Sequence, residues 1–234
     1  MLRTLHRRRR ALPAPAFEAL RTALLESPLV GASTLSGAFS SSRGFAVTFR
    51  GEAGRQKALE RFPTLAPHFA QTLGAPAVRA LTPWWRRSLT RVPNVWYLNV
   101  LLVGAGGTVA KHLDVTLREA SGVTTTTPEL VSVLYLQVPR AKGGELVLAT
   151  SKTLASVVFP EENMRVHFRG DLFHEVRAFE GDGLRASLVL EQYCFTPEAL
   201  ERLPDFQLDS RAGFGAFLEH HAKAPAKKTF ELEP

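Results

Sequence analysis

Two histidines and one aspartate have the types and spacing expected of a metal site. His112 and Asp114 stand two positions apart in the run TVAKHLDVTL, and His174 follows much later in LFHEV. Alternate residues of a β-strand point to the same face, so the His112 imidazole and the Asp114 carboxylate can converge on one point. Two histidines and one carboxylate, with other coordination positions open, suit a non-haem Fe(II) centre. We therefore predict that these three residues bind a metal ion.

Each of the three residues also has a purely structural interpretation. His112 alone fits a hydrogen-bonded core histidine, Asp114 a residue at the end of a strand, and His174 a residue that caps a turn. His167, in MRVHF, is a second candidate for the third ligand. We favour His174 because it follows the Arg-Gly-Asp turn and lies nearer the apolar run at 184–195.

A second pair of residues suggests an anionic ligand. Arg185 and Ser187 are two positions apart and share a strand face. A guanidinium inside a barrel is costly unless an anion meets it, and a dicarboxylate supplies one through a bidentate pair. The Ser187 hydroxyl and the Tyr135 phenol, in VLYLQ, can contact the same carboxylate. The alternative is that Arg185 forms a surface ion pair with Glu191 or Asp182.

The chain from Asn94 onward consists of short apolar runs separated by turn residues. About eight runs follow one another with almost no room for helices: VWYLNVLLV, TVAKHLDVTL, VSVLYLQV, ELVLAT, LASVVF, MRVHF, LFHEVRAF and LRASLVLEQYCF. This pattern predicts a mainly β fold, an antiparallel double sheet or barrel of the jelly-roll type. Residues 115–130, with a threonine run and Gly122, are the one long interruption and are expected to act as a lid.

The chain before Asn94 is predicted to be mainly helical. Apolar periodicity predicts helices at 16–26, 52–62 (ended by Pro63) and 67–73 (ended by Gly74), with a Gly/Ser-rich loop at 31–43 and a strand at 44–50. We divide the chain into a basic arm (1–12), a helical support region (13–93), a β-strand core (94–196) and a C-terminal helix and tail (197–234). The helix is expected at 197–203, and the tail, which carries His220, His221, Lys223, Lys227 and Lys228, is expected to be peripheral.

Composition and charge narrow the class of protein. The 234 residues are 45% hydrophobic and 22% charged, which is ordinary for a globular domain. The formal net charge is +7, and five of the 29 basic residues are Arg3 and Arg7 to Arg10. An exposed basic arm can bind nucleic acid or anionic lipid, and the alternative is a solvated, frayed terminus.

The single cysteine and the apolar segments predict a cytoplasmic protein. Cys194 excludes an internal disulfide framework and is expected to be a small core hydrophobe. Charged residues and prolines interrupt the segment after the basic arm, which argues against a secretory signal, and we find no apolar window long enough to span a membrane.

A cluster of tryptophans and arginines precedes the β-strand core. Trp84, Trp85, Arg86 and Arg87 are consecutive, and with Trp96 and the loop at 115–130 they can approach the mouth of the site. Such a cluster can hold an anionic or planar substrate, including a nucleobase. The alternative is that the tryptophans pack between helix and sheet.

Residues 95–195 resemble the core of the Fe(II)- and 2-oxoglutarate-dependent dioxygenases, in particular the prolyl-hydroxylase-like branch. The resemblance is carried by HLD, YLQ, GGELVL, FPEEN, GDLFHEV and LRASL, in the family's order. It implies a double-stranded β-helix with N-terminal helices on its outer face. It also implies Fe(II) held by His112, Asp114 and His174, and 2-oxoglutarate held by Arg185 with contacts from Tyr135 and Ser187. The implied reaction consumes O2, hydroxylates an unactivated C–H bond, and releases succinate and CO2.

The sequence departs from the resemblance at one position. Prolyl hydroxylases usually carry a tyrosine shortly before the first metal ligand, at the place that Val103 occupies here. Asn99 or Tyr97 can take its role. We therefore expect an amino-acid-like small molecule or a peptidyl side chain as substrate, without choosing between them. Asp114 argues against the halogenating variants, in which chloride takes this coordination position.

Two functions of other classes remain open. A cupin-like metal- or sugar-binding module has the same barrel without catalysis. A nucleic-acid-modifying or nucleic-acid-binding protein would use the basic arm. The longer arginine-rich signature that DNA-repair dioxygenases carry after the Arg185 position is absent here, which disfavours the second alternative.

Overall fold

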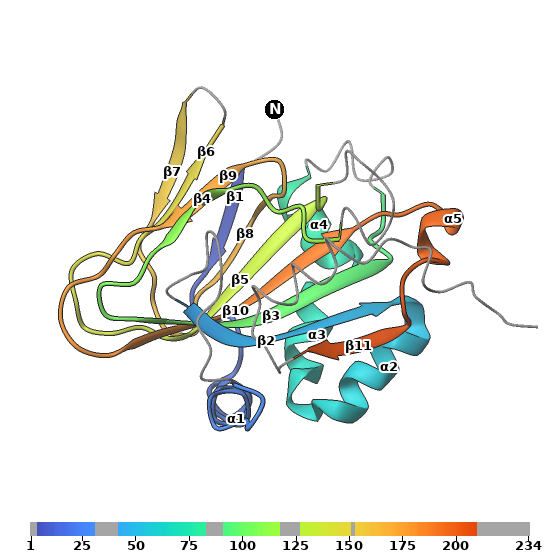
Figure 1. The fold of residues 1–234 in the computed structure, drawn as a ribbon, viewed down its shortest axis with the longest axis horizontal. Helices are drawn as coiled ribbons and strands as arrows, with labels where there is room; N and C mark the ends of the chain where they lie inside the picture. Colours follow the sequence, from blue (N-terminus) through green and yellow to red (C-terminus); the bar gives the residue numbers. More distant parts are fainter. Residues whose placement is uncertain (1–3, 31–41, 83–90, 118–126, 151–152, 210–234) are drawn as a thin grey trace, which may run out of the picture.

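Two antiparallel sheets carry the fold (Figure 1). The computed structural model describes residues 4–30, 42–82, 91–117, 127–150 and 153–209. Its strands are β1 (Leu5–Arg8), β2 (Ser42–Arg50), β3 (Val95–Gly104), β4 (Val109–His112), β5 (Leu130–Gln137), β6 (Leu146–Ala149), β7 (Leu154–Val158), β8 (Arg165–Arg169), β9 (Phe173–Val176), β10 (Leu184–Tyr193) and β11 (Phe206–Asp209).

The strand order is that of a jelly roll. One sheet has seven strands in the order β1-β8-β5-β10-β3-β2-β11, and the other has four in the order β4-β9-β6-β7. The eight strands predicted from Asn94 onward are confirmed as β3 to β10. The predicted jelly-roll, or double-stranded β-helix, core is therefore confirmed. Three strands of the larger sheet, β1, β2 and β11, come from outside residues 94–196.

Alternate residues of the long strands face two different cores. On β3, Tyr97 and Val103 belong to the apolar cluster shared with the four-stranded sheet, whereas Leu98 and Val100 belong to the cluster shared with the helices. The same alternation on β10 places Leu188 against the helices. The period of two therefore decides which side chains can reach the space between the sheets.

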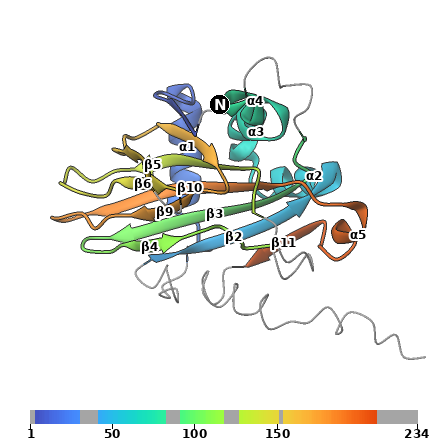
Figure 2. The same cartoon turned by 90° about the horizontal axis from the view of Figure 1, so that it is seen from above.

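Helices cover the outer face of the seven-stranded sheet (Figure 2). They are α1 (Ala14–Leu25), α2 (Gly51–Arg61), the short 3₁₀ helix η2 (Pro63–Leu65), α3 (Ala66–Thr72) and α4 (Ala75–Leu81), and a one-turn helix, α5 (Pro197–Leu200), follows β10. Helix α1 buries Phe17, Leu20 and Leu24. Phe69 of α3 stacks on Phe49 of β2 at 5.3 Å between ring centroids. The helices predicted at 16–26, 52–62 and 67–73 are confirmed, whereas the one predicted at 197–203 ends at Leu200.

The basic arm is not a frayed terminus over residues 5–8, as its arginines had suggested. Residues 5–8 form an edge strand that pairs with β8, with Leu5 opposite Phe168 and Arg8 opposite Arg165. The side chains of Arg7 and Arg8 stay exposed, which is compatible with an edge position, where charged residues are common. Main-chain pairing thus orders a segment whose side chains alone suggest disorder.

Two further expectations are wrong. Trp96 does not approach the mouth of a site: it lies on the outer face of the sheet, stacks on Phe49, and donates a hydrogen bond from Nε1 to Gln192 Oε1 at 3.2 Å. Trp96 directly precedes Tyr97 on β3, and because consecutive strand residues point to opposite faces, Trp96 points toward the helices. Cys194 is only partly buried, so it is not a core residue.

Several sequence features lie outside the described residues. These are Arg3, Trp84 to Arg87, most of the predicted lid (residues 118–126) and the histidines and lysines of the tail. Across the described ranges, none of the helices has the length and apolar character needed to cross a membrane.

Candidate metal centre

The three predicted ligands lie together between the two sheets. His112 is the last residue of β4, Asp114 follows it, and His174 lies directly opposite His112 on β9. Asp114 Oδ1 is 3.4 Å from His112 Nε2 and 3.5 Å from His174 Nε2. The three potential ligand atoms all lie within 4.8 Å of one another. This spacing leaves room for one cation with bonds of the usual length to two imidazoles and a carboxylate.

Backbone carbonyls orient both imidazoles. His112 Nδ1 lies 2.8 Å from the Ala110 carbonyl oxygen, and His174 Nδ1 lies 3.2 Å from that of Leu172. When each Nδ1–H donates to its carbonyl, each Nε2 presents a lone pair toward Asp114. Such support is typical of histidines that bind metals, because it fixes the tautomer and the ring orientation.

Asp114 is a buried carboxylate, and one of its two oxygens has no hydrogen-bond partner among the described residues. It is 5% exposed, and the unpartnered oxygen is Oδ2. Burial alone would raise the pKa of Asp114, but the adjacent His174 and His112 hold it below its usual value. Burial opposes protonation of His174, yet Asp114 raises the pKa of that histidine. Asp114 therefore favours the protonated form of His174, and a proton there competes with a metal ion for Nε2.

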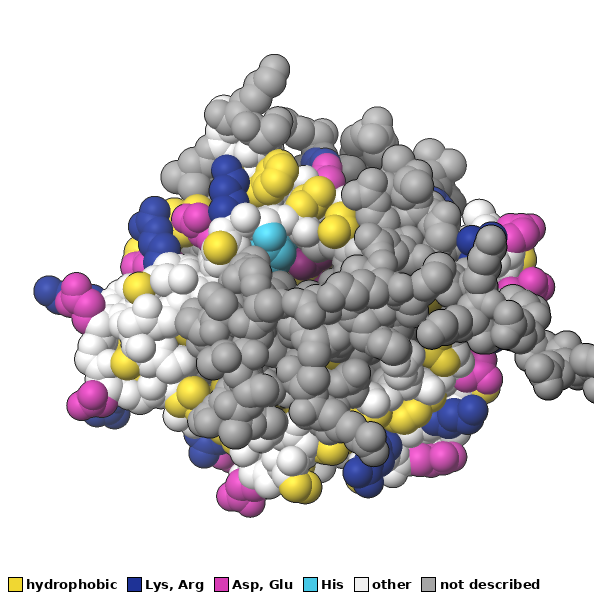
Figure 3. Space-filling model, viewed as in Figure 1, with side chains coloured by type: hydrophobic (Ala, Val, Ile, Leu, Met, Phe, Trp, Pro, Cys, Tyr) yellow, Lys and Arg dark blue, Asp and Glu magenta, His cyan; other side chains and the backbone are white. Residues whose placement is uncertain are grey.

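A narrow cavity leads to the three residues. It is lined by His112, Asp114 and His174 together with Asn99, Arg185 and Ser187, and its walls are apolar side chains such as Val131 and Val133. The His112 side chain is 17% exposed, more than the other two. On the face viewed in Figure 3, a histidine surface is visible beside hydrophobic and acidic side chains. The exposed fraction of His112 shows that part of its side chain reaches solvent.

Arg185 is a buried cation without an anionic partner. Its side chain is 2% exposed, and its Nε and Nη1 have no hydrogen-bond partner in the described part of the chain. Its guanidinium carbon lies 5.2 Å from the ring centroid of Tyr135, whose own hydroxyl is also unpartnered there. Burial lowers the pKa of Arg185, and Tyr135 partly opposes that shift. A guanidinium held in this way is a site for an anion.

The structural alternative for Arg185 is wrong. Asp182 is exposed, whereas Arg185 is buried, and no ion pair joins Arg185 to Asp182 or Glu191 among the described residues. Glu191 instead accepts hydrogen bonds from Thr116 Oγ1, at 3.0 Å, and from the Tyr193 hydroxyl.

The buried carboxyl of Glu191 was not identified in the sequence analysis as part of the site. Burial and the nearby Asp114 raise the pKa of Glu191 well above its usual value, although the hydrogen bonds from Tyr193 and Thr116 oppose the shift. Glu191 has the same position in the alternation as Arg185, and Thr116 stands two residues after Asp114. The period of two along β10 was therefore a signal that could have found Glu191, whereas Thr116 lies in the turn after β4.

The strand register shows where Val103, Asn99 and Tyr97 lie relative to the metal cavity. Val103 is fully buried and lies directly opposite Arg185 on the neighbouring strand. Asn99 is 6% exposed, lines the metal cavity, and has an Oδ1 without a partner in the described residues. Tyr97 lies opposite Glu191 and does not line this cavity. Of the two suggested substitutes, only Asn99 reaches the cavity.

His167 does not compete for the third ligand position. It lies opposite His6 and Ser132 in the seven-stranded sheet, and its Nδ1 is 2.7 Å from Ser132 Oγ. The rings of His6 and His167 stack at 6.0 Å between centroids. This pair belongs to a polar cluster under the helices, away from Asp114.

Comparison with known proteins gives the fold a wider context. No protein-family model matches the sequence, and no curated protein matches it. Among solved structures, the chain is similar to a prolyl-4-hydroxylase from Pseudomonas putida, with 17% identity, a TM-score of 0.53, and coverage of 82% of this chain and 92% of the other. It is also similar to a prolyl hydroxylase from Trichoplax adhaerens, solved in complex with a peptide fragment of the hypoxia-inducible-factor oxygen degradation domain. That match has 14% identity, a TM-score of 0.55, and coverage of 86% and 88%.

A third similar structure is IDO from Bacillus thuringiensis, with 11% identity, a TM-score of 0.50, and coverage of 81% and 89%. At these identities the likeness concerns the fold. The chain has the double-stranded β-helix architecture that is also found in these solved prolyl hydroxylases.

Proposed function

We propose that this protein is an Fe(II)- and 2-oxoglutarate-dependent oxygenase that hydroxylates an amino-acid-like small molecule or a peptidyl side chain. The observation that carries the proposal is the buried, unpartnered Arg185 in the same cavity as His112, Asp114 and His174. A group of three metal-binding residues alone fits many functions. Three metal-binding residues beside a buried arginine favour an anionic ligand that contacts both the metal ion and the arginine.

The residues present fit iron and a keto-acid co-substrate. His112, Asp114 and His174 would hold Fe(II), and their N,O donor set with open positions suits that ion. Arg185 would hold the distal carboxylate of 2-oxoglutarate, with Tyr135 and Ser187 as further hydrogen-bond donors. When bound, the iron and co-substrate supply the oxidising power, by reducing O2 while 2-oxoglutarate loses CO2 to become succinate.

The protein's own residues orient and isolate the reactants. The main-chain contacts to His112 and His174 fix their Nε2 atoms, and apolar side chains such as Val131 and Val133 form the walls around them. Arg185 fixes the position of the co-substrate by pairing with the carboxylate farthest from the metal. Asn99, which has an unpartnered Oδ1 in the same cavity, would receive a hydrogen bond from a ligand or a water molecule.

The substrate class is the finer part of the proposal. The Trichoplax enzyme was solved with a peptide, which supports a peptidyl side chain as one option. Val103, in place of the tyrosine of prolyl hydroxylases, leaves proline itself unsupported. The single cysteine fits a cytoplasmic enzyme.

A substrate screen read by succinate formation tests the proposal. Pure protein with Fe(II), 2-oxoglutarate and O2 should form succinate when a matching amino acid or peptide is present. His112→Ala should abolish the activity, whereas His6→Ala, on the outer face, should leave it intact. Stoichiometric Fe(II) binding without any 2-oxoglutarate turnover across amino acids, peptides and oligonucleotides would favour a non-catalytic cupin-like module. Turnover only with oligonucleotides would favour the nucleic-acid alternative.

A further inference from the structure

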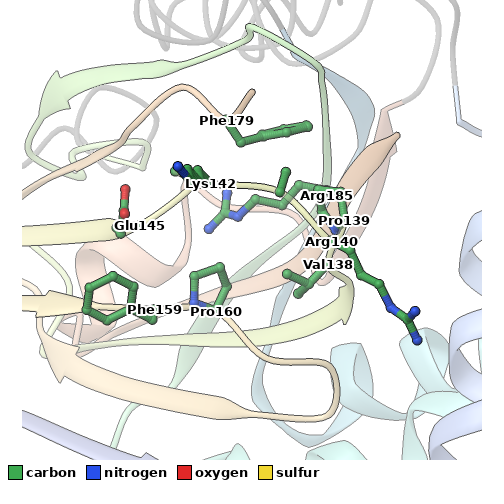
Figure 4. A pocket seen from close by; sticks show the side chains of 12 residues that line it. Val138, Pro139, Arg140, Lys142, Glu145, Phe159, Pro160, Phe179 and Arg185 are labelled. Carbon is green, nitrogen blue, oxygen red and sulfur yellow. The ribbon is translucent and has the colours of Figure 1, made fainter. Parts of the chain in front are cut away.

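A second cavity shares Arg185 with the metal cavity and lies beside the β5–β6 connection (Figure 4). Its volume is about 530 Å³. It is formed by the β5–β6 connection (138–145), by Phe159 and Pro160 after β7, and by Phe179 in the β9–β10 connection. We call it the rear cavity. None of the three candidate metal ligands lines it, and Arg185 lines both cavities.

Main-chain hydrogen bonds hold the walls of the rear cavity in place. Gly144 N donates to the Ala178 carbonyl at 3.1 Å, and Glu180 N donates to that of Lys142 at 2.9 Å. Gly143 has φ +93°, and a Cβ at this position would lie 2.1 Å from the Ala178 carbonyl oxygen. Only glycine permits this close approach of the two connections. The rear cavity is therefore a preformed feature of the barrel end.

The charge in the rear cavity is mainly positive. Figure 4 shows the Arg185 side chain extending into the space between Phe179 on one side and Phe159 and Pro160 on the other. Its Nε and Nη1 have no hydrogen-bond partner among the described residues. Lys142 also lines the cavity, is exposed, and forms no ion pair within the described residues. Glu145 is the one acidic residue of the lining.

The remaining walls are apolar. Phe159 is 64% exposed, which is unusual for a phenylalanine, and Phe179, on the opposite wall, is buried. Exposed aromatic surface next to a buried cation suits a ligand with an apolar body and one negative end. Glu145 disfavours a second negative charge on that ligand by repulsion.

We propose that the rear cavity binds a small monocarboxylate with an apolar body, whose carboxylate pairs with Arg185 and Lys142 and whose body packs on Phe159. A guanidinium has five N–H donors along different edges, so one edge can serve the metal cavity and another the rear cavity. Two anions that share one guanidinium weaken each other's binding, and this coupling is reciprocal. The coupling to 2-oxoglutarate rests on the proposed function, whereas binding in the rear cavity does not.

Binding of 4-fluorophenylacetate to the full-length, metal-free protein tests the proposal. The titration is followed by fluorine NMR, with 4-fluorophenylacetamide as the uncharged control. The acid should bind saturably and the amide should not. Lys142→Ala and Phe159→Ala should each weaken binding roughly tenfold, as expected for a lost charge-assisted hydrogen bond or a lost aromatic contact. Arg177→Ala is the matched control, because Arg177 is an exposed cation of the β9–β10 connection that does not line the cavity, and it should leave binding unchanged.

Two outcomes would overturn the inference. One is the absence of saturable binding of the acid. The other is binding that is the same in Lys142→Ala and Phe159→Ala as in the unchanged protein, since the ligand would then lie elsewhere, for example in the metal cavity. Both variants change exposed side chains, so loss of the fold is not expected, and thermal unfolding checks it.

A second titration separates this inference from the proposed function. In the metal-loaded protein, 2-oxoglutarate should weaken binding of the acid several-fold. Saturable binding of the acid without any effect of 2-oxoglutarate would contradict the coupling and leave the cavity's ligand in place. Normal 2-oxoglutarate turnover without binding of the acid would contradict the rear-cavity proposal and leave the proposed function in place.

Discussion

Replacement of Arg185 by alanine should weaken 2-oxoglutarate binding by about 2–5 kcal/mol, the range for losing one partner of a buried charge pair. This corresponds to a dissociation constant that rises from about 30-fold to several thousand-fold. The upper half of the range is expected because Arg185 is 2% exposed and, among the described residues, no carboxylate neutralises it. The desolvated ligand carboxylate would therefore lose its main counter-charge. The Tyr135 hydroxyl would remain as a neutral donor.

The assay is anaerobic titration of metal-loaded protein with 2-oxoglutarate, followed calorimetrically. Arg140→Ala serves as a control for loss of one positive charge nearby. A further arm uses Arg185→Met without ligand: because a buried charge without a partner costs several kcal/mol, this variant should unfold at a higher temperature than the unchanged protein. An unchanged affinity of Arg185→Ala for 2-oxoglutarate would refute the assignment of Arg185.

Three further outcomes follow from the described contacts. Asp114→Ala should lose stoichiometric Fe(II) binding in equilibrium dialysis, whereas Asp171→Ala, at an exposed aspartate paired with Arg169, should retain it. Burial and the nearby Arg165 lower the pKa of His68 to about 3, so the unfolded chain binds the extra proton and stability falls as pH drops from about 6.5 toward 3, by about 1.4 kcal/mol per pH unit. His68→Leu should reduce the slope in urea unfolding across that range by this amount, while the buried His167 keeps its own contribution; an unaltered slope would contradict the role of His68. Phe49→Ala should cost about 3–5 kcal/mol in urea unfolding, because Phe49 is fully buried against Phe69 and Trp96; a loss below about 1 kcal/mol would contradict its place in the core.

The alternation of residues explains why much of the barrel could be predicted. Apolar runs bounded by turn residues gave β3 to β10; the central strands β3, β5 and β10 are buried on both faces and so need apolar side chains throughout. The same period placed His112 and Asp114 on one face, and Arg185 and Ser187 on another. The structure brings all four into one cavity.

The features that were missed depend on tertiary contacts. Strand β1 is rich in arginine, and only its pairing with β8 makes it a strand. Strand β11 is a short segment after Pro204 whose partner, β2, lies far away in the sequence. Helix α4 has seven residues and a proline in its first turn, so its periodicity is too short to recognise. The rear cavity arises where two turns meet, and no local pattern reports such a meeting.

The proposed function requires that one cavity holds both iron and a keto acid. Bidentate chelation of Fe(II) by a 2-oxo acid gives a visible metal-to-ligand charge-transfer absorption, which requires no knowledge of the substrate. Anaerobic protein titrated with Fe(II) and 2-oxoglutarate should develop this band to saturation at one equivalent of iron, and His174→Ala should abolish it. Protein that binds Fe(II) and shows no band with 2-oxoglutarate, or an undiminished band in His174→Ala, would contradict the claim.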